Sequence, residues 1–368
     1  MKRLILASAA ALAALPLLGA QAISAAEAIA SGAAYLKSLQ TADGAYGSES
    51  LSQNMDAVFA VRAAGYDPAN DKVGGVGPAE FLAANVDQVT NSAIAAKAAL
   101  VAKALGQDPH AVGGVDLVAR AEAGFDPATG LYGKDAFSQS ISMIGLACVG
   151  EPVSDKASAA LIDQQLKDSG GWGFGGFPDP DTTAIAIQAL LATGASASDA
   201  SVAKALAFLK ESQGLDSGWG FDPSASNASS TAYVVQALYA AGQDPESAEY
   251  TVDGVTPIAF LLSQQQPDGS FRGFDPAYST NQVLPALAGR TFCNAADTPI
   301  VNVRPEPTAT PPAPTSTPTA APSVAPGPPS TGTGKVGPEG NNSDVVLGVS
   351  LVTLAIGLAA TSVVKRQG

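Results

Sequence analysis

The sequence predicts an all-α protein in which six helical hairpins close into a ring, an (α/α)6 toroid. Three observations support this fold class. Apolar helical segments that end in glycine recur six times, and a more amphipathic segment usually precedes each one. The chain is rich in Ala and Leu and poor in β-branched strand runs. An open stack of such hairpins would leave two apolar end faces bare, so we expect the ring to close.

Residues 161–194 contain one whole repeat: the end of an outer helix, a Gly-rich aromatic turn, and an inner helix that is apolar nearly all round. A helix with so little polar surface must be buried on most sides. The inner helices are expected at residues 54–65, 92–106, 138–150, 181–194, 229–242 and 279–289. The outer parts of the second and third hairpins are degenerate, and the second lacks the aromatic turn.

The outer helices of hairpins one, four, five and six end in Leu-x3-Gln, followed by a turn with glycine and an aromatic residue. The glutamines are Gln40, Gln165, Gln213 and Gln265, and the aromatic residues are Tyr46, Trp172, Trp219 and Phe271. A glutamine at a helix end can bond exposed carbonyls, and the aromatic ring can pack over it. We therefore expect these residues to be structural staples rather than ligands.

These Leu-x3-Gln-x3/4-Gly-x-aromatic ends resemble the QW-type repeats of the prenyltransferase and squalene-cyclase α/α-toroid superfamily, over most of residues 28–288. The resemblance implies two concentric layers of helices around a funnel. It is specific for the architecture and weakly specific for any activity, because the superfamily also includes protein prenyltransferases, complement thioester domains and cobalamin carriers.

Composition excludes several kinds of chemistry. The net charge is −14 without a basic cluster, which argues against a nucleic-acid partner. His110 is the one histidine, and Cys148 and Cys293 are the two cysteines, so a zinc site of the prenyltransferase type cannot be built. No metal and no cofactor is expected. The two cysteines form either a disulfide, which requires the chain after Gly289 to cross the base of the ring, or two buried thiols.

One hairpin carries a carboxylate at the start of its inner helix. Residues 179–184, Asp-Pro-Asp-Thr-Thr-Ala, resemble the Asp-x-Asp-Asp-Thr-Ala signature of class II terpene cyclases, whose middle aspartate protonates an alkene or epoxide. Asp181 matches that middle position and Asp179 the first, whereas Thr182 replaces the third acid. The same column in other hairpins holds Ser52, Phe137, Ser229 and Tyr278. The alternative hypothesis is that Asp181 only caps its helix, as Ser229 would in the next hairpin.

Four aromatic residues gather where outer helices lead into inner ones: Phe174, Phe177, Phe221 and Phe274. They either line the mouth of a pocket for an apolar ligand or anchor their loops on the ring.

The two ends of the chain predict export and anchoring. The expected segments are a signal peptide (1–22), the toroid (23–303), a disordered Pro/Thr/Ser/Gly-rich stalk (304–343), a transmembrane helix (344–364) and a cytoplasmic tail (365–368). Residues 328–332 resemble a sortase sorting signal with Pro in place of its first Leu, so a retained membrane anchor is the preferred interpretation and wall attachment the alternative.

The preferred functional hypothesis is a toroid displayed on the cell surface that binds an extracellular partner or a small apolar ligand rather than catalysing a reaction. The alternative hypothesis is a terpene-cyclase-like enzyme in which Asp181 is the general acid.

Overall fold

The computed structural model describes residues 23–48, 50–222 and 224–301. The predicted signal peptide, stalk, transmembrane helix and cytoplasmic tail lie outside these residues. No helix within the described ranges is long and apolar enough to cross a membrane. The described residues form a mostly helical toroid, as the repeats predict.

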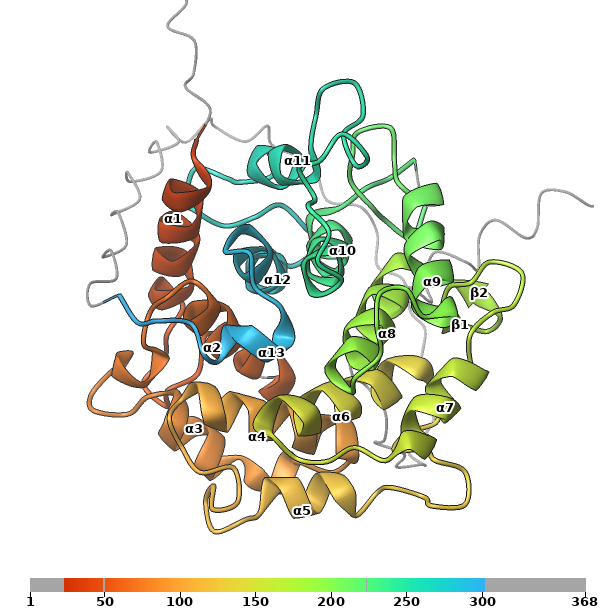
Figure 1. Ribbon diagram of the computed structural model, residues 1–368. Helices are drawn as coiled ribbons and strands as arrows, with labels where there is room; N and C mark the ends of the chain where they lie inside the picture. The colour runs from red at the N-terminus through yellow and green to blue at the C-terminus, as the bar shows by residue number, and fades with distance from the viewer. Residues whose placement is uncertain (1–22, 49, 223, 302–368) are drawn as a thin grey trace, which may run out of the picture. The chain divides into compact units, whose positions relative to one another are not determined.

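Six helical hairpins follow one another along the chain (Figure 1). The inner helices are α2 (Leu51–Ala63), α4 (Ser92–Ala104), α6 (Ala136–Val149), α8 (Pro180–Ala192), α10 (Ala228–Ala240) and α12 (Pro276–Leu287). The outer helices are α1 (Ala25–Ser38), α3 (Pro78–Ala84), α5 (Leu117–Glu122), α7 (Asp155–Asp163), α9 (Ala200–Glu211) and α11 (Pro257–Ser263). Short 3-10 helices, η1 (Pro68–Asn70) and η2 (Val86–Gln88), flank α3, and a two-stranded hairpin, β1 (Gly173–Phe174) with β2 (Phe177–Pro178), precedes α8.

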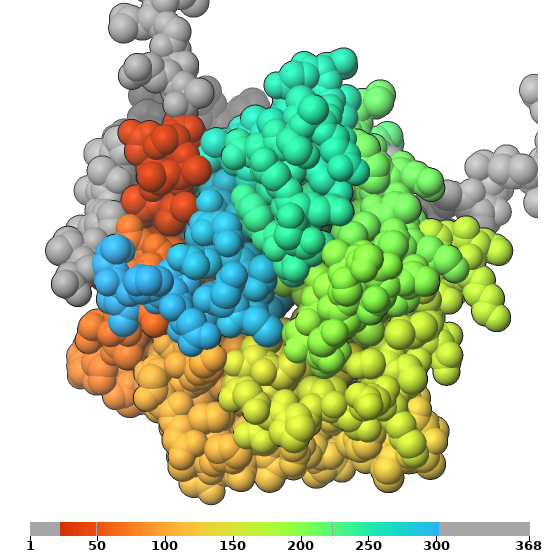
Figure 2. Space-filling model, viewed as in Figure 1, coloured from red at the N-terminus to blue at the C-terminus, as the bar shows by residue number. Residues whose placement is uncertain are grey.

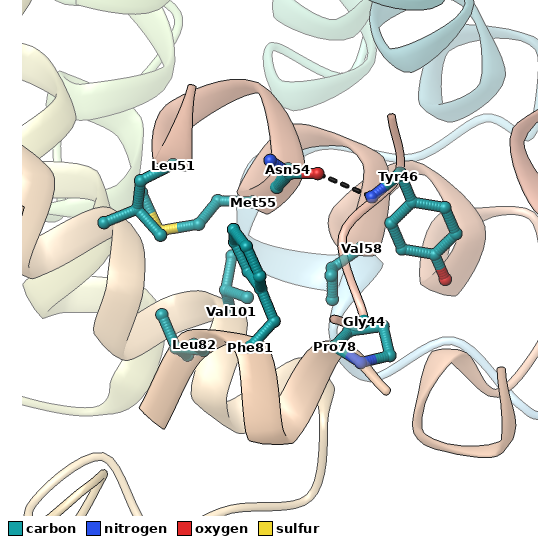
Figure 3. A pocket seen from close by; sticks show the side chains of 10 residues that line it. All are labelled: Gly44, Tyr46, Leu51, Asn54, Met55, Val58, Pro78, Phe81, Leu82 and Val101. Carbon is teal, nitrogen blue, oxygen red and sulfur yellow. Dashed lines mark hydrogen bonds between the residues drawn. The ribbon is translucent and has the colours of Figure 1, made fainter. Parts of the chain in front are cut away.

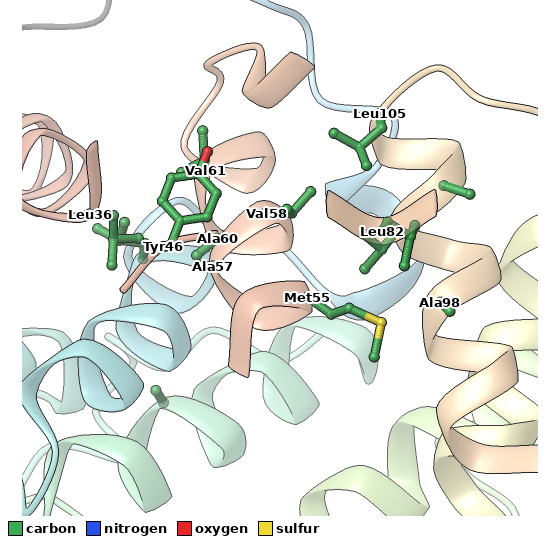
Figure 4. Close-up of a cluster of buried hydrophobic side chains, with 14 of the residues drawn as sticks. Leu36, Tyr46, Met55, Ala57, Val58, Ala60, Val61, Leu82, Ala98 and Leu105 are labelled. Carbon is green, nitrogen blue, oxygen red and sulfur yellow. The ribbon is translucent and has the colours of Figure 1, made fainter. Parts of the chain in front are cut away.

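The inner helices form a closed ring. Each one contacts the next, from α2 through α4, α6, α8 and α10 to α12, and α12 packs against α2. Helices α4 and α6 pack closely at Gly145, where an added Cβ would lie 2.4 Å from the Ala96 carbonyl oxygen. Apolar side chains such as Met55, Val58 and Leu82 fill the space between inner and outer layers (Figure 4).

Glutamine side chains join neighbouring hairpins at four seams. Gln165 donates from Nε2 to Gly170 O in its own turn (2.6 Å) and to Ser201 O in the next outer helix (2.8 Å). Gln213 bridges in the same way to Ser217 O and Tyr250 O, and Gln40 donates to Asp71 O. Gln265 donates to Ala28 O at 2.8 Å and so joins the sixth hairpin to the first.

The aromatic residue of each turn is held by the inner helix that follows it. Trp172 donates from its backbone N to Thr183 Oγ1 (2.9 Å) and from Nε1 to Leu161 O (2.7 Å). Trp219 is bound in the same way by Thr231 and Leu209, while Phe271 and Tyr46 donate their backbone N–H to Thr280 and Asn54. The polar residue in the first turns of the inner helix thus positions the aromatic ring beneath the outer helix.

In the third hairpin another glutamine replaces the one at the end of the outer helix, which the sequence analysis did not predict. Gln139 lies in the inner helix rather than the outer one, and its Oε1 accepts from Tyr132 N (2.7 Å). Its Nε2 donates to Gly130 O and to Ala157 O in the next outer helix, both at 3.1 Å. One side chain therefore does what a Gln and a Thr do together in the fourth and fifth hairpins.

The chain after α12 crosses one end of the ring. Helix α13 (Phe292–Ala295) contacts α2 and α6, and the blue, C-terminal residues of the toroid lie on the face shown in Figure 2. The Phe292 ring stacks on Phe59 with centroids 5.2 Å apart. Cys293 forms a disulfide with Cys148 at the end of α6. The crossing that such a disulfide requires is therefore present.

Candidate active site

The candidate site lies inside the ring, near the first turns of the inner helices. Each inner helix presents one face to the ring axis, and residues four and seven positions apart share that face. The first layer is the column predicted from the sequence, Ser52, Phe137, Asp181, Ser229 and Tyr278. The second layer, one turn further in, contains Asp56, Lys97 and Tyr233, none of which the sequence had singled out.

Asp181 occupies the second position of α8, where its carboxyl group meets little water. Its Oδ1 is buried and has no hydrogen-bond partner among the described residues. Burial raises the pKa of Asp181 to about 7, while a hydrogen bond from Ser230 opposes the rise and the negative charge of Asp179 adds to it. A carboxyl group in this state holds its proton up to neutral pH.

The helix cap is Asp179, not Asp181. The Asp179 carboxylate accepts from Thr182 N at 2.7 Å and from Thr182 Oγ1 at 2.9 Å. In the fifth hairpin the cap is Asn227 rather than Ser229. The capping explanation for Asp181 is therefore wrong, because Asp181 is already the second residue of the helix and its Oδ1 does not bond the helix backbone.

An ion pair joins the first two inner helices of the ring, α2 and α4. Lys97 Nζ lies 2.5 Å from Asp56 Oδ1, and it also donates to Ser52 Oγ at 2.9 Å and to Ser52 O at 3.1 Å. The side chains of Lys97 and Asp56 are 17% and 12% exposed, so a little solvent reaches them. Burial raises the pKa of Asp56, and the Lys97 ammonium group opposes that rise.

Two tyrosines complete the polar group. The hydroxyl oxygens of Tyr233 and Tyr278 lie 3.2 Å apart. Burial is the largest cause that raises the pKa of both phenols, and the negative charges of Asp56 and Asp181 raise them further. Both phenols are thus neutral at physiological pH and lie within electrostatic range of both carboxyl groups.

The polar groups of the site therefore come from five of the six inner helices. The site combines a buried acid that can lose a proton, two neutral phenols whose rings can face a cation, and an ion pair. The signal that could have found Asp56 and Tyr233 is their spacing, since they lie four residues after Ser52 and Ser229 on the same helices.

The four aromatic residues of the rim lie at the same end of the ring as Asp181, because each directly precedes or belongs to a turn that leads into an inner helix. Phe174 and Phe177 are cross-strand neighbours in β1 and β2. Phe221 and Phe274 lie in separate turns before α10 and α12. Phe177 and Phe274 are 70% and 85% exposed, so these rings are not folded onto the toroid as anchors.

Two cavities lie elsewhere in the ring. The smaller, between α2, α3 and α4, has a volume of about 10 Å³ and is lined by residues such as Tyr46, Met55 and Phe81 (Figure 3). It holds no more than a water molecule. The larger, of about 250 Å³, lies at the opposite end of the inner helices from Asp181. Across residues 23–48, 50–222 and 224–301, no three His, Cys, Asp or Glu side chains meet as metal ligands would.

The sequence profile of the squalene-hopene cyclase C-terminal domain matches residues 135–287, which span the third inner helix through the sixth. None of the curated protein sequences is significantly similar to the chain.

Several solved structures are similar to this chain. The type II terpene cyclase MstE from Scytonema matches over 72% of this chain and 97% of its own, at 15% identity and a TM-score of 0.50. The ent-copalyl diphosphate synthase from Streptomyces platensis matches over 72% of this chain and 50% of its own, at 17% identity and a TM-score of 0.41. A protein from Actinoplanes matches over 75% of this chain and all of its own, at 17% identity and a TM-score of 0.49.

At such low identity the first of these likenesses concerns the fold alone, and it shows that one ring can account for nearly the whole of a protein. The family match over the second half of the ring adds a sequence relationship to that fold. Together with the repeated glutamine seams, they support the resemblance of this chain to the prenyltransferase and squalene-cyclase-like α/α-toroid superfamily.

Proposed function

We propose that the ring is a terpene-cyclase-like enzyme that protonates a polyprenyl substrate through Asp181. The observation that carries this proposal is the buried carboxyl oxygen of Asp181, which has no partner in the described part of the chain, on a residue whose pKa is raised to about 7. Neither packing nor helix capping needs an acid there. A proton that is held in a dry, aromatic-lined interior is what an alkene or epoxide requires of its catalyst.

In the proposed reaction, the Asp181 O–H bond breaks and its proton adds to a terminal alkene carbon or an epoxide oxygen. The electron pair of that bond stays on the carboxylate, and the substrate becomes a carbocation that closes rings. Loss of a proton from the cyclised cation ends the reaction and leaves an isomer of the substrate. The rings of Tyr233 and Tyr278 would stabilise the cation by their π faces, as neutral phenols can.

Two features support this over the binding hypothesis preferred from sequence. The likeness to MstE, a type II terpene cyclase, covers 97% of that chain, so a single ring of this fold is compatible with such an enzyme. Asp181 also has no counterpart carboxylate in the first layer of the other hairpins.

The test is to incubate the purified toroid with squalene and with shorter polyprenyl substrates in deuterium oxide and to analyse products by mass spectrometry. We expect a cyclised product that carries one deuterium at the protonated position. Asp181→Asn should lower its rate of formation at least a hundredfold, whereas Asp199→Asn, on the exposed start of α9, should not change it. A folded wild-type protein without product, or product undiminished in Asp181→Asn, would refute the proposal.

The exposed rim favours a second role, the capture of an apolar extracellular ligand. Phe177 and Phe274 extend into solvent at the end of the ring where Asp181 lies. The double variant Phe177→Ser/Phe274→Ser should weaken binding of farnesol to the Asp181→Asn protein without lowering its melting temperature. Unchanged farnesol affinity would speak against a rim that collects apolar molecules.

For the rest of the chain we propose export by residues 1–22 and display outside the cell through a stalk at 304–343 and an anchor at 344–364. The charge-free run of the anchor segment and the basic pair Lys365 and Arg366 support this orientation. Protease treatment of intact cells should then release the toroid, and a toroid released only after cell lysis would contradict it.

A further inference from the structure

The candidate site contains a second carboxyl group, that of Asp56 on α2. Its Oδ1 is paired with Lys97 Nζ, whereas the described residues form no hydrogen bond to its Oδ2. In contrast to Oδ1 of Asp181, this unpaired oxygen is not fully buried. A molecule inside the ring can therefore reach Asp56 Oδ2.

The accessible surface of Asp56 and Lys97 faces the interior of the ring. Both residues lie on inner helices, and α1, α3 and α5 pack on these helices from outside. The side chains of Asp56 and Lys97 are nonetheless 12% and 17% exposed. Ser52 and Asp181 in the first layer are also partly exposed, whereas Ala60, one turn deeper on α2, is 0% exposed. The space that solvent reaches from the Asp181 end therefore extends as far as this ion pair.

Asp56 lies across the ring from Asp181 and further in. Helices α2 and α8 are three places apart in either direction around the ring, so they face each other (Figure 1). Asp56 follows the first layer by four residues, which is about 6 Å along the helix axis. The negative charges of both carboxyl groups act on the phenols of Tyr233 and Tyr278. An extended substrate that is protonated at Asp181 would therefore pass the phenols and approach Asp56.

The surroundings of the two carboxyl groups favour opposite protonation states. Burial keeps the proton on Asp181, whose pKa is raised to about 7. The Lys97 ammonium group, 2.5 Å from Asp56 Oδ1, favours the charged form of Asp56. Burial also raises the pKa of Asp56, and this makes its carboxylate a better proton acceptor than an exposed one. Two carboxyl groups in such different environments suit the roles of acid and base.

We propose that Asp56 is the base that ends the cyclisation, in that its Oδ2 takes the proton that the cyclised cation loses. A C–H bond beside the cationic carbon breaks, its electron pair forms the new double bond, and the proton passes to Oδ2. Water at the open end of the ring then removes this proton and returns one to Asp181, so each cycle yields an isomer without net change in protons. This role rests on the proposed cyclase function.

The test is the composition of the products that the disulfide-bonded protein forms from squalene. In Asp56→Asn the cation still forms but lacks its base, so water should capture more of it. We expect the ratio of cyclised alcohol to cyclised alkene to rise at least tenfold, while the rate of squalene consumption changes less than about threefold. Asp297→Asn removes the partner of Lys103, also on α4 but outside the interior, and should change neither quantity.

Two further variants distinguish a base from an ion pair that only joins α2 to α4. Asp56→Asn/Lys97→Gln leaves no unpaired charge and should show the same rise in alcohol, even if the single variant does not fold. Asp56→Glu restores a carboxylate and should return most of the product to alkene. An unchanged ratio in the double variant, or no recovery in Asp56→Glu, would overturn this role and leave that of Asp181 intact. A folded wild-type protein without product would overturn the proposed function and this role with it.

Discussion

Replacement of Asp181 by asparagine should stabilise the folded ring above pH 7 and have little effect near pH 4. Burial raises the pKa of this carboxyl group from the ordinary value of 3.8 to about 7. Between those pH values the folded protein keeps a proton that the unfolded chain releases. The stability of wild type therefore falls as the pH rises through this window, and the penalty is complete above pH 7.

The magnitude follows from the size of the pKa difference. A difference of about three pH units, at 1.36 kcal/mol per unit, corresponds to ~4 kcal/mol at pH 8. Asparagine has nearly the same shape, does not ionise and can still bond to Ser230. We expect Asp181→Asn to exceed wild type in free energy of unfolding by at least ~2 kcal/mol at pH 8, once relaxation of the buried charge is allowed for.

Urea unfolding of the disulfide-bonded protein, followed by tryptophan fluorescence at pH values from 4 to 8, measures this directly. Trp172 and Trp219 are both fully buried and report loss of the ring. Asp199→Asn removes the same charge from an exposed helix start and should follow wild type at every pH. A loss of stability of ~1 kcal/mol in Asp181→Asn that does not vary with pH would instead indicate a capping residue and refute the reasoning.

Three further predictions test the ring, its base and the acid. Gln265→Ala should lower the free energy of unfolding by ~0.5–1.5 kcal/mol in urea titrations, because it removes the hydrogen bond to the Ala28 carbonyl at the closing seam; an unchanged midpoint would mean that the seam does not hold the ring. Reduction of the Cys148–Cys293 disulfide, which joins residues 145 apart, should cost ~2–5 kcal/mol by the same assay and reverse on reoxidation, whereas no change in stability would argue against a structural role. If Asp181 is the acid, the rate of cyclisation should fall about tenfold per pH unit above pH 7, because only the protonated carboxyl group reacts, and a rate that is flat from pH 6 to 9 would contradict that assignment.

Much of the ring could be predicted from local pattern, because glycine ends, apolar faces and the Leu-x3-Gln motif are short-range signals. The seams at Gln165, Gln213 and Gln265 are of this kind. The seam of the third hairpin was not predicted, because Gln139 replaces the missing motif from the inner helix instead of the outer one. Its contacts therefore depend on tertiary structure rather than on spacing in the sequence.

Only part of the candidate site could be predicted from the sequence, for the same reason. Asp181 could be found because its neighbours resemble a known signature. Lys97 and Asp56 are separated along the chain from each other and from Asp181; packing of α2 against α4 forms their ion pair, which depends on tertiary structure. The capping hypothesis assigned the N-cap two residues too late, since sequence alone does not distinguish Asp179 from Asp181 as the N-cap of the helix.

The bond from Gln265 to Ala28 joins residues 237 apart, so the last seam of the toroid unites the beginning and the end of the folded chain. While the protein is being synthesised, one apolar flank of the first hairpin stays exposed until the sixth hairpin has left the ribosome. Hairpins can therefore fold and pack one after another from the N-terminal end, but the ring cannot close until the last hairpin is present. Chains that are halted early are expected to associate through that waiting flank, and this is a hazard that an open solenoid with capped ends does not share.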